Sequence, residues 1–203
     1  MKSIFYDWGG ANEWLFHLIN SFNGKLLDKV MALGSMLGSH KNFGYFQGLV
    51  ILYAIFSLSK IPDPQEKLLK TRYWFTILAV FNIAYMLDGL FLGVLKPLLN
   101  FPRPPLALPS GSLHIIGEPE LKHRFPSGHA SFAMVLVASF WPVFNRCFRT
   151  VGIFFVVWVC LSRISVGAHF PADVLGGALS SLAIVLLVRH RLVPKLMDDN
   201  RTV

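Results

Sequence analysis

Five apolar stretches along the chain are long enough, or nearly so, to cross a bilayer as helices. They lie roughly at 43–59, 73–95, 129–145, 150–167 and 172–188. A spanning helix must bridge about 30 Å of hydrocarbon. The last three stretches are short, so we expect them to pack together and to end near the lipid headgroups. Because lipid cannot satisfy exposed backbone groups, the pattern predicts an all-α fold, a polytopic transmembrane helical bundle with five clear spans.

The residues that precede the first apolar stretch show a weaker pattern. Residues 11–22 look like an amphipathic helix, and Trp14 suits a membrane interface. Residues 26–38 are apolar but include Asp28 and Lys29, so they fit either a short sixth span or a shallow re-entrant helix. We therefore expect six helical elements, with a short N-terminal helical region that need not cross the membrane.

The composition agrees with a membrane protein of one domain. Of the 203 residues, 54% are hydrophobic and 15% are charged, whereas an average soluble domain has about 25% charged residues. The length suits a single domain over residues 1–203, with residues 1–42 as an interfacial, short helical region. The net charge of +8 would be compatible with nucleic-acid binding, but the basic residues lie between apolar stretches, where membrane topology explains them better. The first residues do not resemble a cleaved signal peptide.

Basic residues predict the orientation of the chain in the membrane. Segments 60–72, 145–149 and 189–201 are rich in Lys and Arg and fall on one side if the spans alternate. The positive-inside tendency makes that side cytoplasmic, together with the C-terminus. Segments 96–128 and 167–171 then face the periplasmic or extracytoplasmic side of the cell (inner) membrane. The positive-inside tendency does not account for the basic residues of these two segments, but binding of an anionic substrate would explain them.

The segment 96–128 is rich in Pro and Gly, which break helices. A connection of about 30 residues without regular structure is uncommon and is usually functional. We therefore expect an active-site loop on the outer face. Four of its residues are candidates for contact with a lipid headgroup: His114, Lys122, His123 and Arg124.

Three cations lie at the same predicted membrane depth: Lys96, Arg103 and Arg163. Like charges at one depth repel one another unless an anion joins them. Arginine offers a planar fork that fits paired phosphate oxygens, and lysine supplies a compact point charge. Each residue taken singly could instead anchor the chain to the headgroups by snorkelling. Together with the histidines described next, the set favours a phosphate site.

The sequence Ser127-Gly128-His129 opens an apolar stretch directly after Pro126. Ser127 is a favourable N-cap, and Gly128 lets a backbone N–H approach a ligand closely. The N-terminus of a helix binds phosphate. An ordinary capped helix would explain the first residues of this cluster but not a histidine at the rim of a membrane span.

His169 and Asp173 both lie at the start of the last apolar helix, where Pro171 suits the first turn. A carboxylate that binds one imidazole nitrogen orients the ring and leaves the other nitrogen free to attack. A structural hydrogen bond and a metal site are the alternatives. Two ligands are too few for a closed zinc site, and neighbouring arginines would repel a cation, so no metal or other cofactor is expected.

Asp88 lies inside the apolar stretch 73–95. A carboxylate within a membrane span is a functional hypothesis by default, although it could simply pair with a cation or a polar neighbour in the bundle. We leave Asp88 outside the set of catalytic residues.

The three clusters follow one another as Lys-x6-Arg-Pro, Pro-Ser-Gly-His and Ser-Arg-x5-His-x3-Asp between residues 96 and 173. In this order they resemble the three-part signature of the type 2 phosphatidic acid phosphatase (PAP2) superfamily, and all three parts are intact. The superfamily includes lipid phosphate, undecaprenyl pyrophosphate and lipid A phosphatases, and also vanadium haloperoxidases, which are soluble. Residues 19–38 are similar, more loosely, to the N-termini of small bacterial members.

The resemblance implies a role for each site residue. His169 would attack phosphorus and form a phosphohistidine, oriented by Asp173, while His129 would protonate the leaving oxygen and then help to activate water. Five residues would hold the phosphate oxygens: Lys96, Arg103, Ser127, Gly128 and Arg163. The phosphatases of this family require no metal, and phosphoryl transfer needs positioning and charge stabilisation above all.

The leading hypothesis is therefore an integral membrane phosphatase that hydrolyses a phosphate or pyrophosphate monoester of a lipid. Undecaprenyl pyrophosphate is the first candidate substrate, on size and on the N-terminal resemblance, while phosphatidylglycerol phosphate, phosphatidic acid and lipid A phosphate remain open. A lipid phosphotransferase would use the same site and differ only in the acceptor. A non-catalytic anion-binding protein or transporter would need polar residues near the middle of the membrane, of which Asp88 is the main example.

Overall fold

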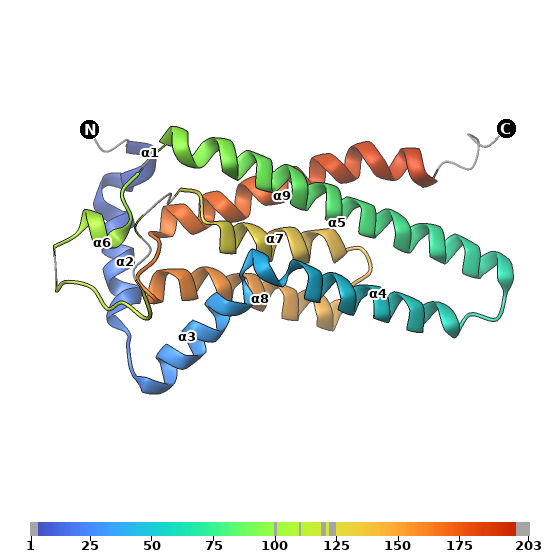
Figure 1. Cartoon of the computed structure of the whole chain (residues 1–203), viewed down its shortest axis with the longest axis horizontal. Coiled ribbons are helices and arrows are strands. Elements are labelled where there is room, and N and C mark those ends of the chain that lie inside the picture. Colours follow the sequence, from blue (N-terminus) through green and yellow to red (C-terminus); the bar gives the residue numbers. More distant parts are fainter. Residues whose placement is uncertain (1–3, 100, 110, 119–120, 122–124, 198–203) are drawn as a thin grey trace.

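Long helices that run side by side make up most of the molecule (Figure 1). The structure is a computed structural model that describes residues 4–99, 101–109, 111–118, 121 and 125–197. In chain order its helices are α1 (Ile4–Asp7), the 3-10 turn η1 (Trp8–Gly10), α2 (Ala11–Ser21), α3 (Lys25–Leu37), the 3-10 turn η2 (His40–Asn42), α4 (Phe43–Ser59), α5 (Pro64–Leu99), α6 (Pro104–Ala107), α7 (Gly128–Phe140), α8 (Arg146–Ser165) and α9 (Pro171–Met197). No strand occurs in the described residues, and the prediction of an all-α helical bundle is confirmed.

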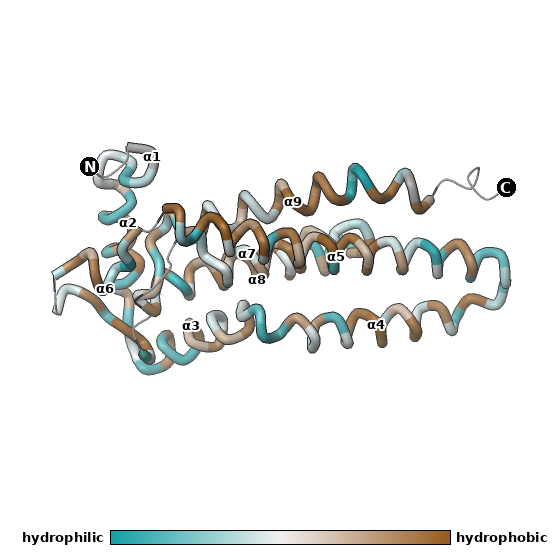
Figure 2. The backbone as a smooth tube through the Cα atoms, turned by 45° about the horizontal axis from the view of Figure 1, so that its top comes forward, coloured by the Kyte–Doolittle hydropathy of each residue, from teal (hydrophilic) through white to brown (hydrophobic). Residues whose placement is uncertain are grey.

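Within the described residues, four helices are long and apolar enough to cross a membrane: α4, α5, α8 and α9. Large apolar side chains point outward from them. Leu52 on α4 is 65% exposed and Phe154 on α8 is 69% exposed, a surface that hydrocarbon solvates far better than water. Figure 2 shows hydrophobic residues concentrated along the bundle, with more hydrophilic ones towards its two ends. Four of the five predicted spans therefore coincide with helices of spanning length.

The fifth predicted span, 129–145, is shorter than expected, because α7 has 13 residues and ends at Phe140. Pro142 has no N–H and cannot bond to the carbonyl of Ala138 four residues earlier. That carbonyl accepts a hydrogen bond from the guanidinium of Arg189 instead. Arg189 also donates to the carbonyl of Ser139 at 3.4 Å. A side chain of α9 thus caps the C-terminal end of α7.

α7 lies at the centre of the bundle, in contact with α5, α8 and α9. Nearly all of its residues are buried. Phe132 and Phe140 belong to one core cluster with Phe81 of α5 and Val185 of α9. A helix that is apolar all round is stable only when its neighbours cover every face. The burial of α7 explains how a short helix can be part of a membrane bundle without facing lipid on its own.

The two longest helices of the N-terminal region are α2 and α3. α2 crosses one end of the bundle, and α3 leans against α8 (Figure 1). α3 has 13 residues, whereas a span needs about 20. It approaches α8 so closely that a Cβ at Gly34 would lie 2.5 Å from Ser162 Oγ. For residues 26–38, a short helix packed on the bundle agrees with the structure better than a sixth span.

The segment 60–72, predicted as a linker between spans, is helical from Pro64 onward. Asp63 Oδ2 accepts a hydrogen bond from the backbone N–H of Glu66 at 2.9 Å, which is the geometry of an N-cap, and proline is favoured at the first helical position. α5 has 36 residues, and a helix of that length extends about 54 Å at 1.5 Å per residue. It therefore reaches well beyond the hydrocarbon core of a bilayer.

The segments that carry the three motifs meet at one end of the bundle. α5 and α8 end there, α7 and α9 begin there, and α2 and α6 lie beside them (Figure 1). α9 runs from this end to Met197 at the opposite end. The directions of the helices thus bring Lys96, Ser127 and His169 to one level.

α7 and α9 approach so closely at this end that Gly177 cannot be enlarged without strain. A Cβ at Gly177 would lie 2.4 Å from the backbone carbonyl oxygen of Ser127. We expect Gly177→Ala to lower the melting temperature of the protein in detergent by several degrees, since overpacking costs about 1–3 kcal/mol. Gly89→Ala in α5 meets no atom within 4 Å, so it should leave the melting temperature unchanged or slightly higher. Equal melting temperatures of the two variants would contradict the close approach.

Candidate active site

His169 and Asp173 face each other at the beginning of α9, and both side chains are almost completely buried. His169 Nδ1 lies 3.3 Å from Asp173 Oδ2, and the same oxygen accepts a hydrogen bond from the backbone N–H of Phe170 at 2.9 Å. The other carboxylate oxygen, Oδ1, accepts from the hydroxyl of Tyr6 at 2.8 Å. The imidazole therefore presents Nδ1 to the carboxylate, and Nε2 points away from it.

The first backbone N–H groups of α9 already have partners within the protein. The N–H of Ala172 donates to Asn12 Oδ1 at 2.9 Å, and the N–H of Asp173 donates to the carbonyl of Phe170 at 3.0 Å. Pro171 has no N–H. An anion at this end must therefore be held by side chains and by the start of α7 rather than by the backbone of α9.

Arg103 and Arg163 reach the residues around His169 from two different segments. Arg103, which precedes α6, donates from Nη1 to the carbonyl of Ala168 at 3.3 Å. The backbone carbonyl of Arg163 accepts the N–H groups of Ala168 and His169 at 3.2 and 3.1 Å. The side chain of Arg163 donates from Nη1 to Ser35 Oγ of α3 at 2.6 Å. Both arginines are almost fully buried, and buried cations at this end of the bundle favour the binding of an anion.

Ser127 occupies the N-cap position of α7, as predicted, but its hydroxyl does not cap the helix. The Oγ atom is buried and has no hydrogen-bond partner among the described residues. A buried hydroxyl without a partner costs free energy, so a ligand that accepts its hydrogen bond would stabilise the site. The backbone N–H of Ser127 donates to the carbonyl of Asp173 at 2.9 Å, which joins the start of α7 to the start of α9.

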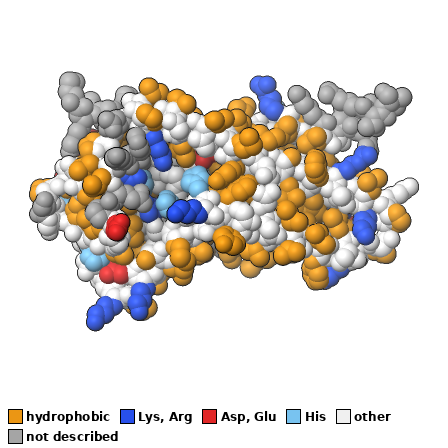
Figure 3. Space-filling model, viewed as in Figure 1, with side chains coloured by type: hydrophobic (Ala, Val, Ile, Leu, Met, Phe, Trp, Pro, Cys, Tyr) orange, Lys and Arg blue, Asp and Glu red, His pale blue; other side chains and the backbone are white. Residues whose placement is uncertain are grey.

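Lys96 and His40 reach the first turn of α7 from α5 and from η2. A Cβ at Gly128 would lie 3.5 Å from Lys96 Nζ and 3.0 Å from His40 Nε2, so the missing side chain leaves room for both nitrogens. Figure 3 shows His side chains beside Lys and Arg side chains towards this end of the molecule, with further Lys and Arg side chains at the opposite end. The sequence interpretation missed His40. The sequence pattern around His40 resembles that around His129. His40 follows Ser39, the N-cap of η2, and stands just before an apolar helix.

His129 lies in the first turn of α7 and is half-buried. The backbone contact between Ser127 and Asp173 holds this turn beside α9, so both predicted histidines belong to adjoining helix ends. Three loop residues that the sequence offered as headgroup contacts lie outside the described residues: Lys122, His123 and Arg124.

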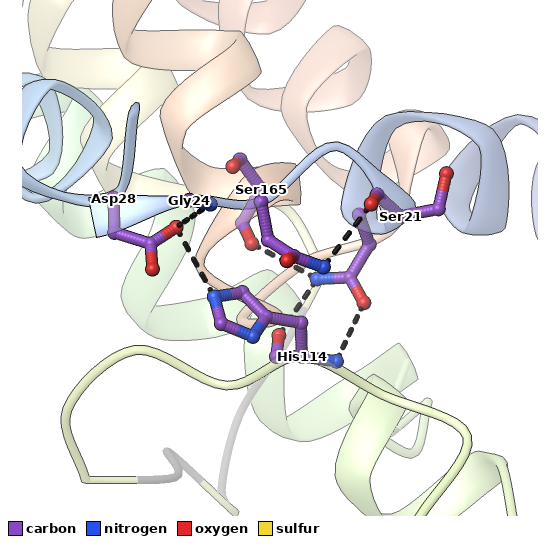
Figure 4. Close-up of polar contacts among 7 residues, drawn as sticks. Ser21, Gly24, Asp28, His114 and Ser165 are labelled. Atoms are coloured by element: carbon purple, nitrogen blue, oxygen red, sulfur yellow. Dashed lines mark hydrogen bonds and ion pairs between the residues drawn. The ribbon is translucent and has the colours of Figure 1, made fainter. Parts of the chain in front are cut away.

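His114, the fourth candidate for headgroup contact, fastens the loop to the N-terminal helices (Figure 4). Its Nε2 lies 3.1 Å from Asp28 Oδ1 in α3. The side chain of Asn20 in α2 accepts from the N–H of His114 at 2.9 Å and donates to its carbonyl at 2.7 Å. Asn20 also donates to the carbonyl of Ser165 at 2.9 Å. These contacts indicate a structural role for His114.

Asp88 is completely buried and joins three helices. Its carboxylate accepts hydrogen bonds from the hydroxyl of Ser131 in α7 and from the hydroxyl of Ser181 in α9, the latter at 2.7 Å. The two hydroxyl oxygens lie 2.8 Å apart. Of the alternatives for this intramembrane carboxylate, pairing with polar neighbours is the one that the structure shows.

Removing the carboxylate of Asp88 should destabilise the packing of α5 against α7 and α9. We expect Asp88→Ala to lower the melting temperature in detergent by an amount that corresponds to about 1–3 kcal/mol, because the buried hydroxyl of Ser131 loses its acceptor and α5 loses its hydrogen bonds to α7 and α9. Asn82→Ala is a matched control on the same helix, since Asn82 Nδ2 donates to the carbonyl of Leu78 within α5. Similar losses in both variants would contradict a joining role for Asp88.

Comparison with known proteins identifies the family. The profile of the PAP2 superfamily matches residues 74–196, more than half of the chain. The chain belongs to the PAP2 superfamily. The matched range contains all three motifs, and the resemblance predicted from them is confirmed.

Two curated relatives are named lipid A 1-phosphatase, one from Rhizobium etli and one from Rhizobium johnstonii. They are 36% and 35% identical to this PAP2 chain over 80 residues, which are 37% of the chain. The match covers 34% and 32% of the relatives themselves, so the chain spans about a third of their length.

Two solved structures share the fold of this PAP2 chain. One is Aquifex aeolicus LpxE, with a TM-score of 0.72 and 24% identity over 89% of this chain and 95% of that chain. The other is the first transmembrane PAP2 type phosphatidylglycerolphosphate phosphatase from Bacillus subtilis, with a TM-score of 0.68 and 22% identity over 95% of this chain and 89% of that chain. The likeness supports the prediction of a multi-pass membrane bundle, which is confirmed.

Proposed function

We propose that this chain is an integral membrane lipid phosphatase in which His169 attacks the phosphorus of a phosphate or pyrophosphate monoester of a lipid. The observation that carries the proposal is the buried pair of His169 and Asp173, whose Nδ1 and Oδ2 atoms lie 3.3 Å apart. Arg103 Nη1 donates to the carbonyl of Ala168, next to His169. The backbone carbonyl of Arg163 accepts the N–H of His169. A nucleophile, an orienting carboxylate and cations are the parts that phosphoryl transfer needs. Membership of the PAP2 superfamily and the names of the relatives support the same class of reaction.

In the first step, Nε2 of His169 forms a bond to phosphorus while the bond from phosphorus to the lipid oxygen breaks. The electron pair of the broken bond stays on the lipid oxygen, which takes a proton from His129 and leaves. The Nδ1–H of His169 donates to Asp173, which stabilises the positive charge on the ring. In the second step, His129 takes a proton from water as the water oxygen forms a bond to phosphorus. The bond from phosphorus to Nε2 of His169 breaks, and its electron pair returns to Nε2. Inorganic phosphate then leaves, and His169 is regenerated.

Charge on the transferring group would be stabilised by the five residues proposed from the sequence: Lys96, Arg103, Ser127, Gly128 and Arg163. The buried Ser127 hydroxyl, which has no partner among the described residues, would donate to a phosphate oxygen. Groups that are fixed before the reaction stabilise its transition state more effectively than water that must reorganise. The three cations would supply positive charge of the kind that metal ions supply in other phosphoryl-transfer enzymes.

The surroundings of the site favour a lipid substrate. Helices with exposed apolar side chains lead up to this end of the bundle, so a substrate anchored in the bilayer reaches the site by lateral diffusion. A cavity of about 280 Å³ adjoins Arg163, and its walls combine apolar residues of α3 and the loop with Glu118. The names of relatives favour lipid A 1-phosphate or phosphatidylglycerol phosphate as the substrate. The size of the chain and the resemblance of residues 19–38 to small bacterial members favour undecaprenyl pyrophosphate.

A lipid phosphotransferase is the second candidate function, since it would share the first step and pass the phosphoryl group to another lipid instead of water. Release of inorganic phosphate by the purified protein without a second lipid would separate the two. A transporter has less support, because the intramembrane carboxylate of Asp88 is bound by Ser131 and Ser181.

His169→Ala should abolish the release of inorganic phosphate from the lipid substrates, because the nucleophile is lost. Asp173→Asn should lower kcat by about 10³–10⁴-fold, the loss expected when an orienting carboxylate becomes an amide. The assay uses protein purified in detergent with EDTA and compares lipid A 1-phosphate, phosphatidylglycerol phosphate, phosphatidic acid and undecaprenyl pyrophosphate. His190→Ala, an exposed histidine near the other end of α9, is the matched control. Full activity of a folded His169→Ala variant would rule out this nucleophile.

We also propose that the site end faces the extracytoplasmic side of the cell membrane and that the C-terminus is cytoplasmic. Cys147 is exposed near the start of α8, at the end opposite to the site. A membrane-impermeant maleimide should label Cys147 only after the cells are permeabilised. Ser112→Cys, in the exposed loop and combined with Cys147→Ser, should be labelled in intact cells. The reverse pattern would contradict the orientation.

A further inference from the structure

Tyr6 in α1 reaches the pair of side chains at the start of α9. Its hydroxyl donates to Asp173 Oδ1 at 2.8 Å, although the two residues are 167 positions apart in the sequence. The second oxygen of the carboxylate, Oδ2, faces His169 Nδ1 and the N–H of Phe170. Because its two oxygens have different partners, the carboxylate can satisfy all of them in one orientation only.

Two further rings hold the side chain of Tyr6 in place. It stacks on Phe101, with ring centroids 4.3 Å apart and planes inclined by 12°, and it meets Phe125 edge to face at 6.0 Å and 79°. Phe101 lies shortly before Arg103 in the chain, and Phe125 lies shortly before Ser127. The aromatic cluster of Tyr6, Phe101 and Phe125 thus joins α1 to two of the segments that supply proposed phosphate ligands, those of Arg103 and Ser127.

We propose that Tyr6 is a positioning residue: its hydroxyl fixes the carboxylate of Asp173, which in turn fixes the imidazole of His169 for attack. This inference rests on the proposed function and assigns Tyr6 no contact with the phosphate. Asp173 has no exposed surface, so bulk water does not replace a donor that is removed. Without the phenol, the carboxylate has a weaker preference for the orientation that serves His169 Nδ1. The imidazole then spends less time aligned with phosphorus.

A purely structural role for Tyr6 would consist of anchoring α1 through its ring. The two roles use different parts of the side chain, and this makes them separable. The ring contributes the stack on Phe101, whereas only the hydroxyl touches Asp173. A variant that keeps the ring and removes the hydroxyl therefore tests positioning, and a variant that removes the stacking partner tests anchoring.

Tyr6→Phe should lower kcat for phosphate release by about 10- to 100-fold, the loss expected for a hydrogen bond to a charged group. KM should change little, because the residues proposed to bind phosphate remain in place. Tyr45→Phe, an exposed tyrosine on α4, is the matched control and should retain the wild-type kcat. Phe101→Leu keeps the Tyr6 hydroxyl and should lower kcat less than Tyr6→Phe does.

The decisive comparison combines Tyr6→Phe with Asp173→Asn. If Tyr6 acts through Asp173, the double variant should be no slower than Asp173→Asn alone. Wild-type kcat in Tyr6→Phe, a full additive loss in the double variant, or a larger loss in Phe101→Leu would each overturn the positioning role. In those cases the inactivity of His169→Ala would still support the proposed function. If the folded wild-type protein released no phosphate from any of the lipids, both proposals would fall.

Discussion

The carboxylate of Asp173 is a charged group without exposed surface, and such a group is stable inside a protein only when donors surround it. Two of its donors lie just before it in the chain, the N–H of Phe170 and the imidazole of His169, and the third is the hydroxyl of Tyr6 from the N-terminal region. The backbone carbonyl of the same residue accepts the N–H of Ser127. Hydrogen bonds to the carboxylate and the backbone carbonyl of Asp173 therefore hold α1 and the starts of α7 and α9 together.

Contacts elsewhere in the bundle maintain that arrangement, because they fix the position of α7, the short central helix. Asp88 binds serines of α7 and α9 below the site, and Arg189 caps the far end of α7. Because α7 is covered by its neighbours, such contacts fix its depth along the bundle and its rotation about its own axis. The candidate site residues consequently lie on helix ends and short turns that are tied to the core, where their geometry is maintained before a substrate binds.

Hydropathy located the long helices because a bilayer imposes both their length and their composition. It was less informative where packing decides the outcome. The apolar run 129–145 continues past the real end of α7; Pro142 signals the break in the sequence, but its compensating partner Arg189 comes from another helix. Residues 26–38 form a short helix that packs on α8 through Gly34, and local apolarity does not distinguish such a helix from a short span.

The motifs by themselves determined the family, and the alternation of spans brought Lys96, Ser127 and His169 to one end, because the direction of each helix follows from its order in the chain. Tertiary structure alone decided that Tyr6 touches Asp173 and that His40 lies against the first turn of α7. It also decided that the Ser127 hydroxyl leaves its helix uncapped. These contacts join residues from distant parts of the chain, and their formation depends on how helices rotate and pack, about which local sequence patterns carry no information.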